Sequence, residues 1–150
     1  MNVATLLATK GPNVVTVRPD ASVRQALGLL AEHNIGALVV VDDRVHPVGI
    51  LSERDVVREA ARNEAVFALA VSGLMTRNVI LGVPQDDLVA VASAMTEHRI
   101  RHLPVVDGGR LVGIISIGDI VKAQRDQYQG EVDTLQLQIL GEVPAAVQGR

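Results

Sequence analysis

The feature that most constrains the fold is a sequence that occurs twice, 65 positions apart. Residues 32–42, EHNIGALVVVD, align with residues 97–107, EHRIRHLPVVD, and seven of the eleven positions are identical. After a one-residue difference in the turn, residues 48–55 match residues 112–119. Because the matching blocks follow one another in the same order, they indicate a duplication, and we expect two copies of one structural unit.

Each copy predicts the element order β-α-β-β-α. The expected strands are residues 14–17, 37–41 and 48–51 in the first copy, and residues 79–83, 103–106 and 111–115 in the second. The first helix follows Ser22 or Asp87 as its capping residue and carries apolar side chains at i, i+3, i+4 and i+7. The second helix begins at Ser52 or Ser116. Neither half can bury its apolar face alone, so we predict an α+β fold of two β-α-β-β-α repeats packed through their sheets with pseudo-two-fold symmetry.

The predicted organisation is a first repeat at residues 3–62, a packed helical connector at 63–73, a second repeat at 74–125, and a C-terminal helix and tail at 126–150. Within the tail, Val132, Leu135 and Ile139 form one helical stripe. This stripe is expected to pack on its own domain or on a second subunit; a partner-recognition helix is the alternative.

Composition excludes several classes of function. The net charge is −3 and no run of Lys or Arg exceeds two residues, so no nucleic-acid partner is expected. The chain lacks cysteine, and Phe67 and Tyr128 are its only aromatics, so any ligand base must contact aliphatic side chains. The longest apolar stretch, residues 35–41, is too short to span a bilayer. With no signal-peptide pattern, we predict a cytoplasmic protein without membrane contact.

A Ser-x-x-Asp motif stands at the same strand-to-helix junction in each copy, as Ser52 with Asp55 and as Ser116 with Asp119. One interpretation is structural, because this spacing is typical of a capping box that stabilises the start of a helix. The other is a ligand site, because a helix N-terminus binds anions and an Asp near it can accept two ribose hydroxyls.

The two copies differ in one set of basic residues. Arg101 and His102 precede the first core strand of the second copy, where the first copy has Gly36 and Ala37. Two basic side chains at this place suit a phosphate group, although a solvated strand end is the alternative. The histidines have no acidic cluster at ligand spacing around them, and no nucleophile has a base beside it. We therefore predict neither a metal site nor an enzyme.

The motifs together resemble a tandem pair of CBS domains, also called a Bateman module. Residues 75–80, 100–107 and 113–121 carry the resemblance most fully, and it covers roughly residues 3–125. The resemblance implies adenosine-containing ligands, such as AMP, ADP, ATP or S-adenosylmethionine, bound in clefts between the repeats. It also implies a homodimer, as CBS pairs commonly form disc-like dimers.

The resemblance implies one cleft for each repeat. At the cleft of the second repeat, Asp119 is expected to hold the ribose, and the other expected residues are Ser116, Arg101 and His102 at the phosphate and Gly11, Pro12 and Val14 along the wall. At the cleft of the first repeat, the expected residues are Asp55, Ser52, Arg54, Thr76, Arg77 and Val79. We expect the first cleft to bind more weakly, because it lacks the basic pair.

The leading hypothesis is a stand-alone regulatory module that binds an adenosine-containing ligand, needs no obligatory cofactor, and signals to an unidentified target protein. The alternative is a non-catalytic dimeric scaffold that binds no nucleotide, in which the Ser-x-x-Asp motifs act only as helix caps.

Overall fold

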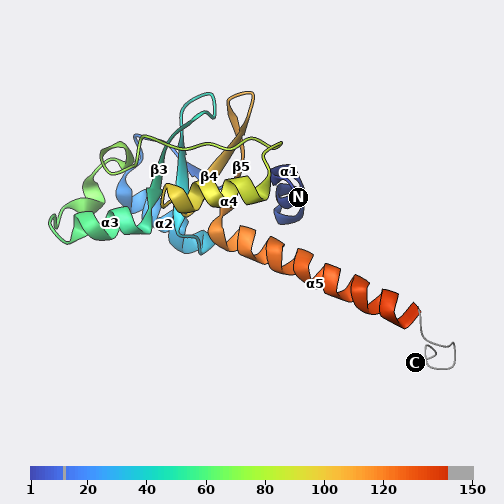
Figure 1. The fold of residues 1–150 in the computed structure, drawn as a ribbon. Coiled ribbons are helices and arrows are strands. Elements are labelled where there is room, and N and C mark those ends of the chain that lie inside the picture. The colour runs from blue at the N-terminus through green and yellow to red at the C-terminus, as the bar shows by residue number, and fades with distance from the viewer. Residues whose placement is uncertain (12, 142–150) are drawn as a thin grey trace.

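The computed structural model describes residues 1–11 and 13–141, and it folds them into two small sheets with helices around them (Figure 1). The first repeat contains β1 (Thr16–Val17), α2 (Val23–His33), β2 (Ala37–Val41), β3 (Pro47–Ser52) and α3 (Glu53–Ala60). The second contains α4 (Leu88–Glu97), β4 (His102–Asp107), β5 (Arg110–Ser116) and α5 (Ile117–Gly141). Helix α1 (Val3–Lys10) precedes both, and two 3₁₀ turns, η1 (Val66–Ala68) and η2 (Val71–Gly73), connect them.

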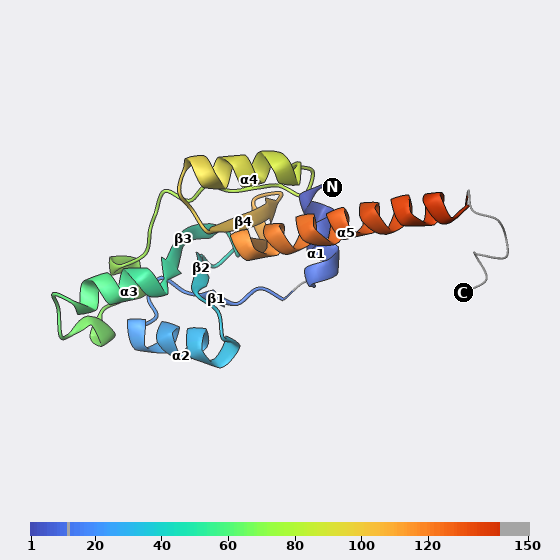
Figure 2. The same ribbon diagram turned by 60° about the horizontal axis from the view of Figure 1, so that its bottom comes forward.

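The predicted fold class is confirmed, with the same hairpin in each repeat. β2 pairs antiparallel with β3, and β4 pairs antiparallel with β5. Both hairpins carry a register shift at the same place, between Val40 and Val41 and between Val105 and Val106. Figures 1 and 2 show the two sheets side by side, and the Leu111 N–H donates to the Val45 carbonyl at 3.0 Å across the hairpins.

The two opening strands are shorter than predicted. In the first repeat only Thr16–Val17 forms a strand, parallel to β2. In the second, the strand expected at residues 79–83 is wrong in extent, because only a parallel bridge between Gly82 and Val105 remains. Gly82 weakens this segment as a strand, because glycine has no side chain to pack, and a Cβ at this position would lie 2.7 Å from Leu103 Cδ2.

The predicted helix caps are present. The Ser22 side chain accepts the Gln25 N–H while the Gln25 side chain accepts the Ser22 N–H, which makes a full capping box. Asp87 caps α4 by accepting the N–H groups of the second and third helical residues. These side chains satisfy backbone donors that a helix start otherwise leaves free.

The core consists of two aliphatic clusters, one for each repeat, and each includes a segment that lies outside that repeat in the sequence. Helix α1 belongs to the second repeat, where Val3 and Leu6 are buried together with Val91, Met95 and Ile115. The connector belongs to the first repeat, whose buried cluster includes Val66, Val71 and Met75 from the chain after α3. The chain therefore exchanges segments between its halves, and Figure 2 shows α1 beside α5.

Two equivalent glycines make this exchange possible. A Cβ on Gly49 in β3 would lie 2.6 Å from the Met75 sulfur, and a Cβ on Gly113 in β5 would lie 2.6 Å from a Leu7 methyl carbon. Real Cβ atoms essentially never approach that closely. The Val-Gly-Ile motif is repeated because each hairpin passes directly under the crossing segment.

The connector is helical only in the turns η1 and η2, and its Val66 and Val71 side chains are buried. The expected tail helix is one continuous helix with the last helix of the second repeat, because α5 passes residue 126 without a break. Its distal part extends away from the body (Figure 1). No helix within the described residues is both long and apolar enough to cross a membrane.

Candidate nucleotide-binding site

The Ser-x-x-Asp motif of the first repeat forms a capping box at the start of α3. Asp55 Oδ2 accepts the Ser52 N–H at 2.9 Å and the Ser52 hydroxyl at 3.0 Å, and the Asp55 N–H donates back to Ser52 Oγ at 3.2 Å. These bonds engage a single carboxylate oxygen, because Oδ1 of Asp55 has no hydrogen bond to a described residue. The capping role therefore leaves Oδ1 available to a ligand.

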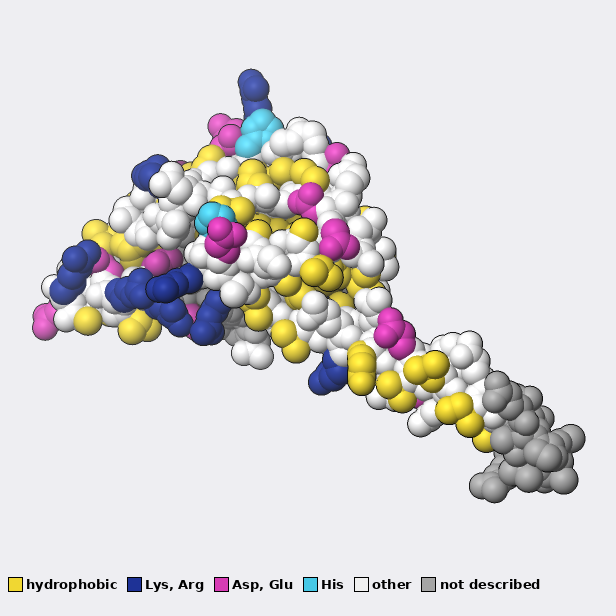
Figure 3. Space-filling model, viewed as in Figure 1, with side chains coloured by type: hydrophobic (Ala, Val, Ile, Leu, Met, Phe, Trp, Pro, Cys, Tyr) yellow, Lys and Arg dark blue, Asp and Glu magenta, His cyan; other side chains and the backbone are white. Residues whose placement is uncertain are grey.

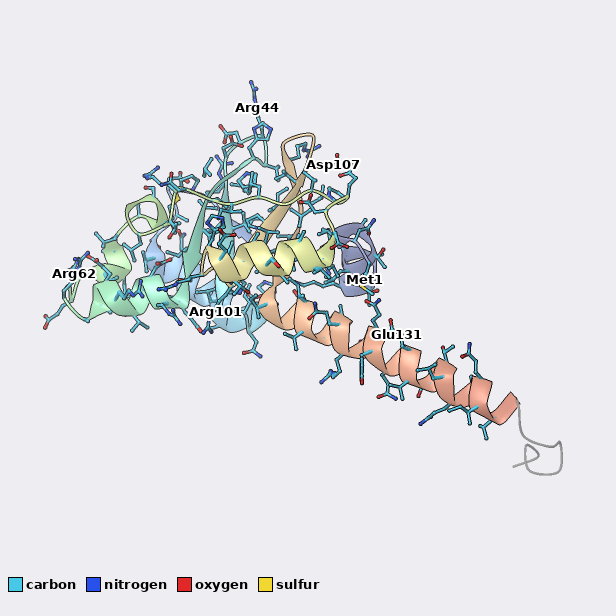
Figure 4. The ribbon with its side chains drawn as sticks, in the orientation of Figure 1. Met1, Arg44, Arg62, Arg101, Asp107 and Glu131 are labelled. Atoms are coloured by element: carbon cyan, nitrogen blue, oxygen red, sulfur yellow. The ribbon has the colours of Figure 1, made fainter. Side chains whose placement is uncertain are left out.

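Asp55 lines a cavity of about 550 Å³ between the repeats. Ser52, Arg54 and Arg58 line it from the first repeat, and Arg99, Arg101 and His102 line it from the second. Arg101 lies between α3 and the start of α5 (Figure 4). The cavity therefore joins the helix N-terminus of one repeat to the first core strand of the other.

The cavity has an excess of positive charge. Four arginines line it, Arg54, Arg58, Arg99 and Arg101, against the two carboxylates of Glu53 and Asp55, which leaves a formal charge of +2. None of the four guanidinium groups forms an ion pair with a described residue. Figure 3 shows Lys and Arg side chains gathered over α3 and toward α5. Unpaired guanidinium groups around one hollow make a site for an anion.

Arg99 is held in an unusual backbone conformation. Its φ is 55°, in the left-handed region that Gly and Asn favour. The equivalent residue of the first repeat is Asn34, with a φ of 51° at the end of α2. An arginine at a position suited to asparagine is a local strain in the wall of the cavity, and such strain is typical of binding sites.

The rest of the cavity is mostly aliphatic. Ile50, Val79, Ile80 and Ile100 line it, together with Gly36, Thr76 and Asn78. No aromatic side chain is among the lining residues, so a ligand base would contact branched aliphatic groups, as the composition predicts. Apolar walls with a few converging polar groups are the usual surroundings of a small-molecule site.

The second repeat repeats the capping box at the start of α5, but its carboxylate has an additional partner. Asp119 Oδ2 accepts the Ser116 N–H at 2.9 Å, and the Asp119 N–H donates to Ser116 Oγ at 3.1 Å. Lys10 Nζ lies 2.6 Å from the same Oδ2 and 2.7 Å from the Ile114 carbonyl oxygen. A smaller cavity of about 430 Å³ beside this junction is lined by Arg101, His102, Ser116, Ile117 and Gly118.

Two groups near this junction have shifted pKa values. Burial raises the pKa of Asp119, but hydrogen bonds from Lys10 and Ser116 outweigh it, so the pKa lies below its usual value. Burial lowers the pKa of His102, and the positive charges of Lys10 and Arg101 lower it further, against Asp119 and Glu53. The His102 imidazole is therefore neutral at pH 7.

The structure brings together most residues that the resemblance implies for the first cleft. Five of the six line the larger cavity, namely Ser52, Arg54, Asp55, Thr76 and Val79. The sixth, Arg77, donates instead to the Ser72 carbonyl oxygen at 3.0 Å.

For the second cleft, Arg101, His102 and Ser116 line the smaller cavity, whereas Asp119, Gly11 and Val14 do not. Pro12 lies outside the described residues. Arg101 and His102 line both cavities, although the sequence assigned them to one. Within the described chain no group of His, Asp and Glu is arranged to hold a metal ion.

Sequence reasoning missed three basic residues, and a signal existed for two of them. Arg58 follows Arg54 by four positions, which places both on one helix face. Arg99 lies two positions before Arg101 and aligns with Asn34 of the first copy. It therefore belongs to the set of basic residues that distinguishes the second copy from the first. Lys10 gave no signal, because its role depends on the packing of α1 against the other repeat.

Comparison with known proteins identifies the family. The family model for the CBS domain matches the chain twice, at residues 7–62 and 71–126. The chain belongs to the CBS domain family and contains a tandem pair, which is the Bateman module that the motifs indicated.

Several relatives share the architecture. A CBS-domain-containing protein from Agrobacterium tumefaciens has 45% identity and a TM-score of 0.78, over 83% of this chain and 99% of that one. The CBS domain pair of the protein MJ0100, solved in complex with 5′-methylthioadenosine and S-adenosyl-L-methionine, has 30% identity and a TM-score of 0.76, over 85% of this chain and 98% of that one. The CBS domain-containing protein YhcV of Bacillus subtilis is 34% identical over 77% of this chain and 82% of its own.

Proposed function

We propose that this protein is a regulatory module that binds a phosphorylated adenosine ligand in the larger cavity, beside Asp55. The observation that carries the proposal is the group of four unpaired arginines around a cavity that also holds this carboxylate. Asp55 Oδ1 would accept ribose hydroxyls, the arginines would bind the phosphates, and the aliphatic walls would contact the base. The adenosine ligands of the MJ0100 domain pair support the ligand class.

The charge of the cavity favours a particular kind of adenosine ligand. AMP, ADP and ATP carry negative phosphates, whereas S-adenosylmethionine carries a positive sulfonium and 5′-methylthioadenosine carries no charge. A formal charge of +2 attracts the first group and repels the sulfonium. We therefore propose that the first cleft is the main site and that it selects AMP, ADP or ATP over S-adenosylmethionine. The basic pair had instead led us to expect stronger binding in the second cleft.

The variant Arg99→Asn tests this proposal with little risk to the fold. Asparagine occupies the equivalent position in the first repeat with nearly the same φ, so the backbone should accept it and stability should hold or rise. Loss of one charge-assisted hydrogen bond, about 1.5–3 kcal/mol, should weaken ADP binding by roughly 10- to 100-fold. Adenosine, which has no phosphate, should bind the variant as well as it binds the wild type.

Calorimetry with ADP, ATP, adenosine and S-adenosylmethionine provides the measurement, with Asp55→Asn as the matched variant that should weaken every adenosine ligand. Tighter binding of S-adenosylmethionine than of ADP, or unchanged ADP binding by Arg99→Asn, would contradict the phosphate assignment. If no adenosine ligand binds the wild type, the scaffold hypothesis replaces this one. Turnover of ADP by the purified protein would contradict a purely regulatory role.

We also propose that the regulatory unit is a homodimer that pairs through α5. Val121, Tyr128, Leu135 and Ile139 are all more than half exposed, and with Arg125 and Val132 they follow the alternating three- and four-residue spacing of a coiled-coil seam. Figure 3 shows hydrophobic side chains along this helix. The six side chains of the seam would bury on the order of 600 Å² of surface on each chain. Two copies would therefore bury about 1,200 Å² in total, which is the lower range for a specific interface.

A second copy is the fitting occupant because a helix seam of this spacing is complementary to another helix with the same spacing. The flanking positions are mostly glutamine, so no charge pattern opposes self-pairing. The target protein and the cytoplasmic location stay predictions.

A further inference from the structure

The two repeats present the same carboxylate in different ways. Asp55 lines the first cavity, and Ser52 is the partner of its side chain among the described residues. Asp119 does not line the second cavity, and Lys10 holds its Oδ2 at 2.6 Å. The Asp119 side chain is 27% exposed.

We propose that Lys10 is a built-in occupant of the second cleft. Its ammonium group lies 2.6 Å from Oδ2 of Asp119, so it neutralises the carboxylate and occupies the space beside it that the ribose of a second adenosine ligand would approach. The chain therefore binds one nucleotide at the first cleft, and Lys10 determines that number. This inference rests on the proposed function, because it assigns to Asp119 the ribose-binding role proposed for Asp55.

The backbone explains why a side chain enters one cleft and not the other. In the first repeat the crossing segment forms a bridge with β3, in which the Ile50 N–H donates to the Thr76 carbonyl at 3.0 Å and the Thr76 N–H donates to the Ile50 carbonyl at 2.8 Å. Residue 11 is the repeat equivalent of Thr76. The Gly11 N–H instead closes the last turn of α1 by donating to Leu7, so it cannot form the same bridge.

Lys10 supplies the missing partner of the sheet. The carbonyl of Ile114, which corresponds to that of Ile50, accepts a hydrogen bond from Lys10 Nζ at 2.7 Å. The Lys10 ammonium thus replaces the backbone N–H donor of the bridge and at the same time contacts the Asp119 carboxylate. The residue that aligns with Lys10 is Met75, which packs over Gly49 of the first repeat and carries no charge.

A ligand cannot easily displace Lys10. The Lys10 ammonium adds Coulomb attraction to its hydrogen bond with Asp119, whereas a ribose hydroxyl is neutral and offers the hydrogen bond alone. Helix α1 is also fixed in place, because Val3 and Leu6 on the same helix are buried in the core of the second repeat. The ammonium group therefore stays beside Asp119 while α1 is docked.

The variant Lys10→Met tests the proposal, since methionine is the residue at the equivalent position of the other repeat. The probe is ADP, and calorimetry measures the number of ADP molecules bound per chain. We expect one for the wild type, two for Lys10→Met, and one for the control Lys10→Arg, which keeps a cation at Asp119. In the double variant Lys10→Met, Asp55→Asn, the remaining tight site should be the second cleft, again with one ADP per chain.

Each outcome decides one of the two proposals. One ADP per chain in both the wild type and Lys10→Met, with the same or weaker affinity in the variant, overturns the occupancy of the second cleft and leaves the first cleft standing. Weaker binding in particular would show that Lys10 contacts the phosphate. Binding only by Lys10→Met would support the occupancy and reject the first cleft. Failure of both proteins to bind ADP would overturn both proposals.

Discussion

Substitution of Gly113 by alanine tests the packing of α1 over the sheet of the second repeat. The new Cβ would lie 2.6 Å from one Leu7 methyl carbon and 2.9 Å from the other, so α1 would have to move or Leu7 would have to leave its rotamer. Overpacking of this kind costs about 1–3 kcal/mol of unfolding free energy. Removal of the partly buried Leu7 side chain alone should cost about 1–2 kcal/mol, below the full range for a core leucine.

The double variant Leu7→Ala, Gly113→Ala measures the contact itself. The smaller residue at position 7 makes room for the new Cβ, so the double variant should be more stable than the sum of the single effects by about 1–2 kcal/mol. Urea unfolding followed by circular dichroism is the assay, and with a slope of about 2 kcal/mol per molar, 2 kcal/mol shifts the midpoint by about 1 M.

A glycine without such a contact provides the control. Gly28 lies within α2, and a Cβ there meets nothing within 4 Å, so Gly28→Ala should stabilise the protein by about 0.5–1 kcal/mol. The reasoning fails if Gly113→Ala is as harmless as Gly28→Ala, or if the effects at positions 7 and 113 simply add. Either result would mean that α1 does not pack over β5 in solution.

Two further predictions concern α5 and His102. Leu135→Glu, on the α5 seam, should shift the protein from dimer to monomer in sedimentation equilibrium. Leu137 is about 200° around the same helix and somewhat more exposed, so Leu137→Glu should leave the dimer intact. Equal effects of both variants would refute pairing through the seam. His102 is neutral at about pH 7 because burial lowers its pKa, and a bound phosphate would favour the imidazolium. ADP binding should therefore tighten as the pH falls from about 7 to about 6, with proton uptake seen in calorimetry in two buffers. His102→Gln should lose this component, and an unchanged pH slope in that variant would exclude His102 from the site.

Much of the fold could be predicted because its signals are local. The Ser52–Asp55 and Ser116–Asp119 hydrogen bonds connect residues three positions apart, and their spacing alone predicted both the helix start and the place of the carboxylate. The hairpin strands were predicted within a residue or so because continuous apolar runs bounded by turns define them. The opening strand expected at residues 79–83 was not, because its pairing depends on a parallel partner, Val105, which follows only after a helix in the sequence.

The cavity could be predicted only in part. Comparison of the repeats drew attention to Arg101, and the same comparison contained Arg99, whose left-handed backbone is visible only in the structure. The sequence also assigned Arg101 and His102 to one cleft, whereas the two cavities adjoin and share both residues. Such sharing depends on the distance between the repeats, which no pattern within one repeat encodes.

The sequence by itself determined that one β-α-β-β-α unit occurs twice, that each copy carries a Ser-x-x-Asp motif, and that the copies differ in their basic residues. Only the tertiary structure decided which carboxylate has a charged partner. Lys10 and Asp119 are 109 positions apart, and they meet because α1 packs in the core of the second repeat. Local spacing can specify a helix cap, but a contact at this separation follows from which apolar surfaces bury one another.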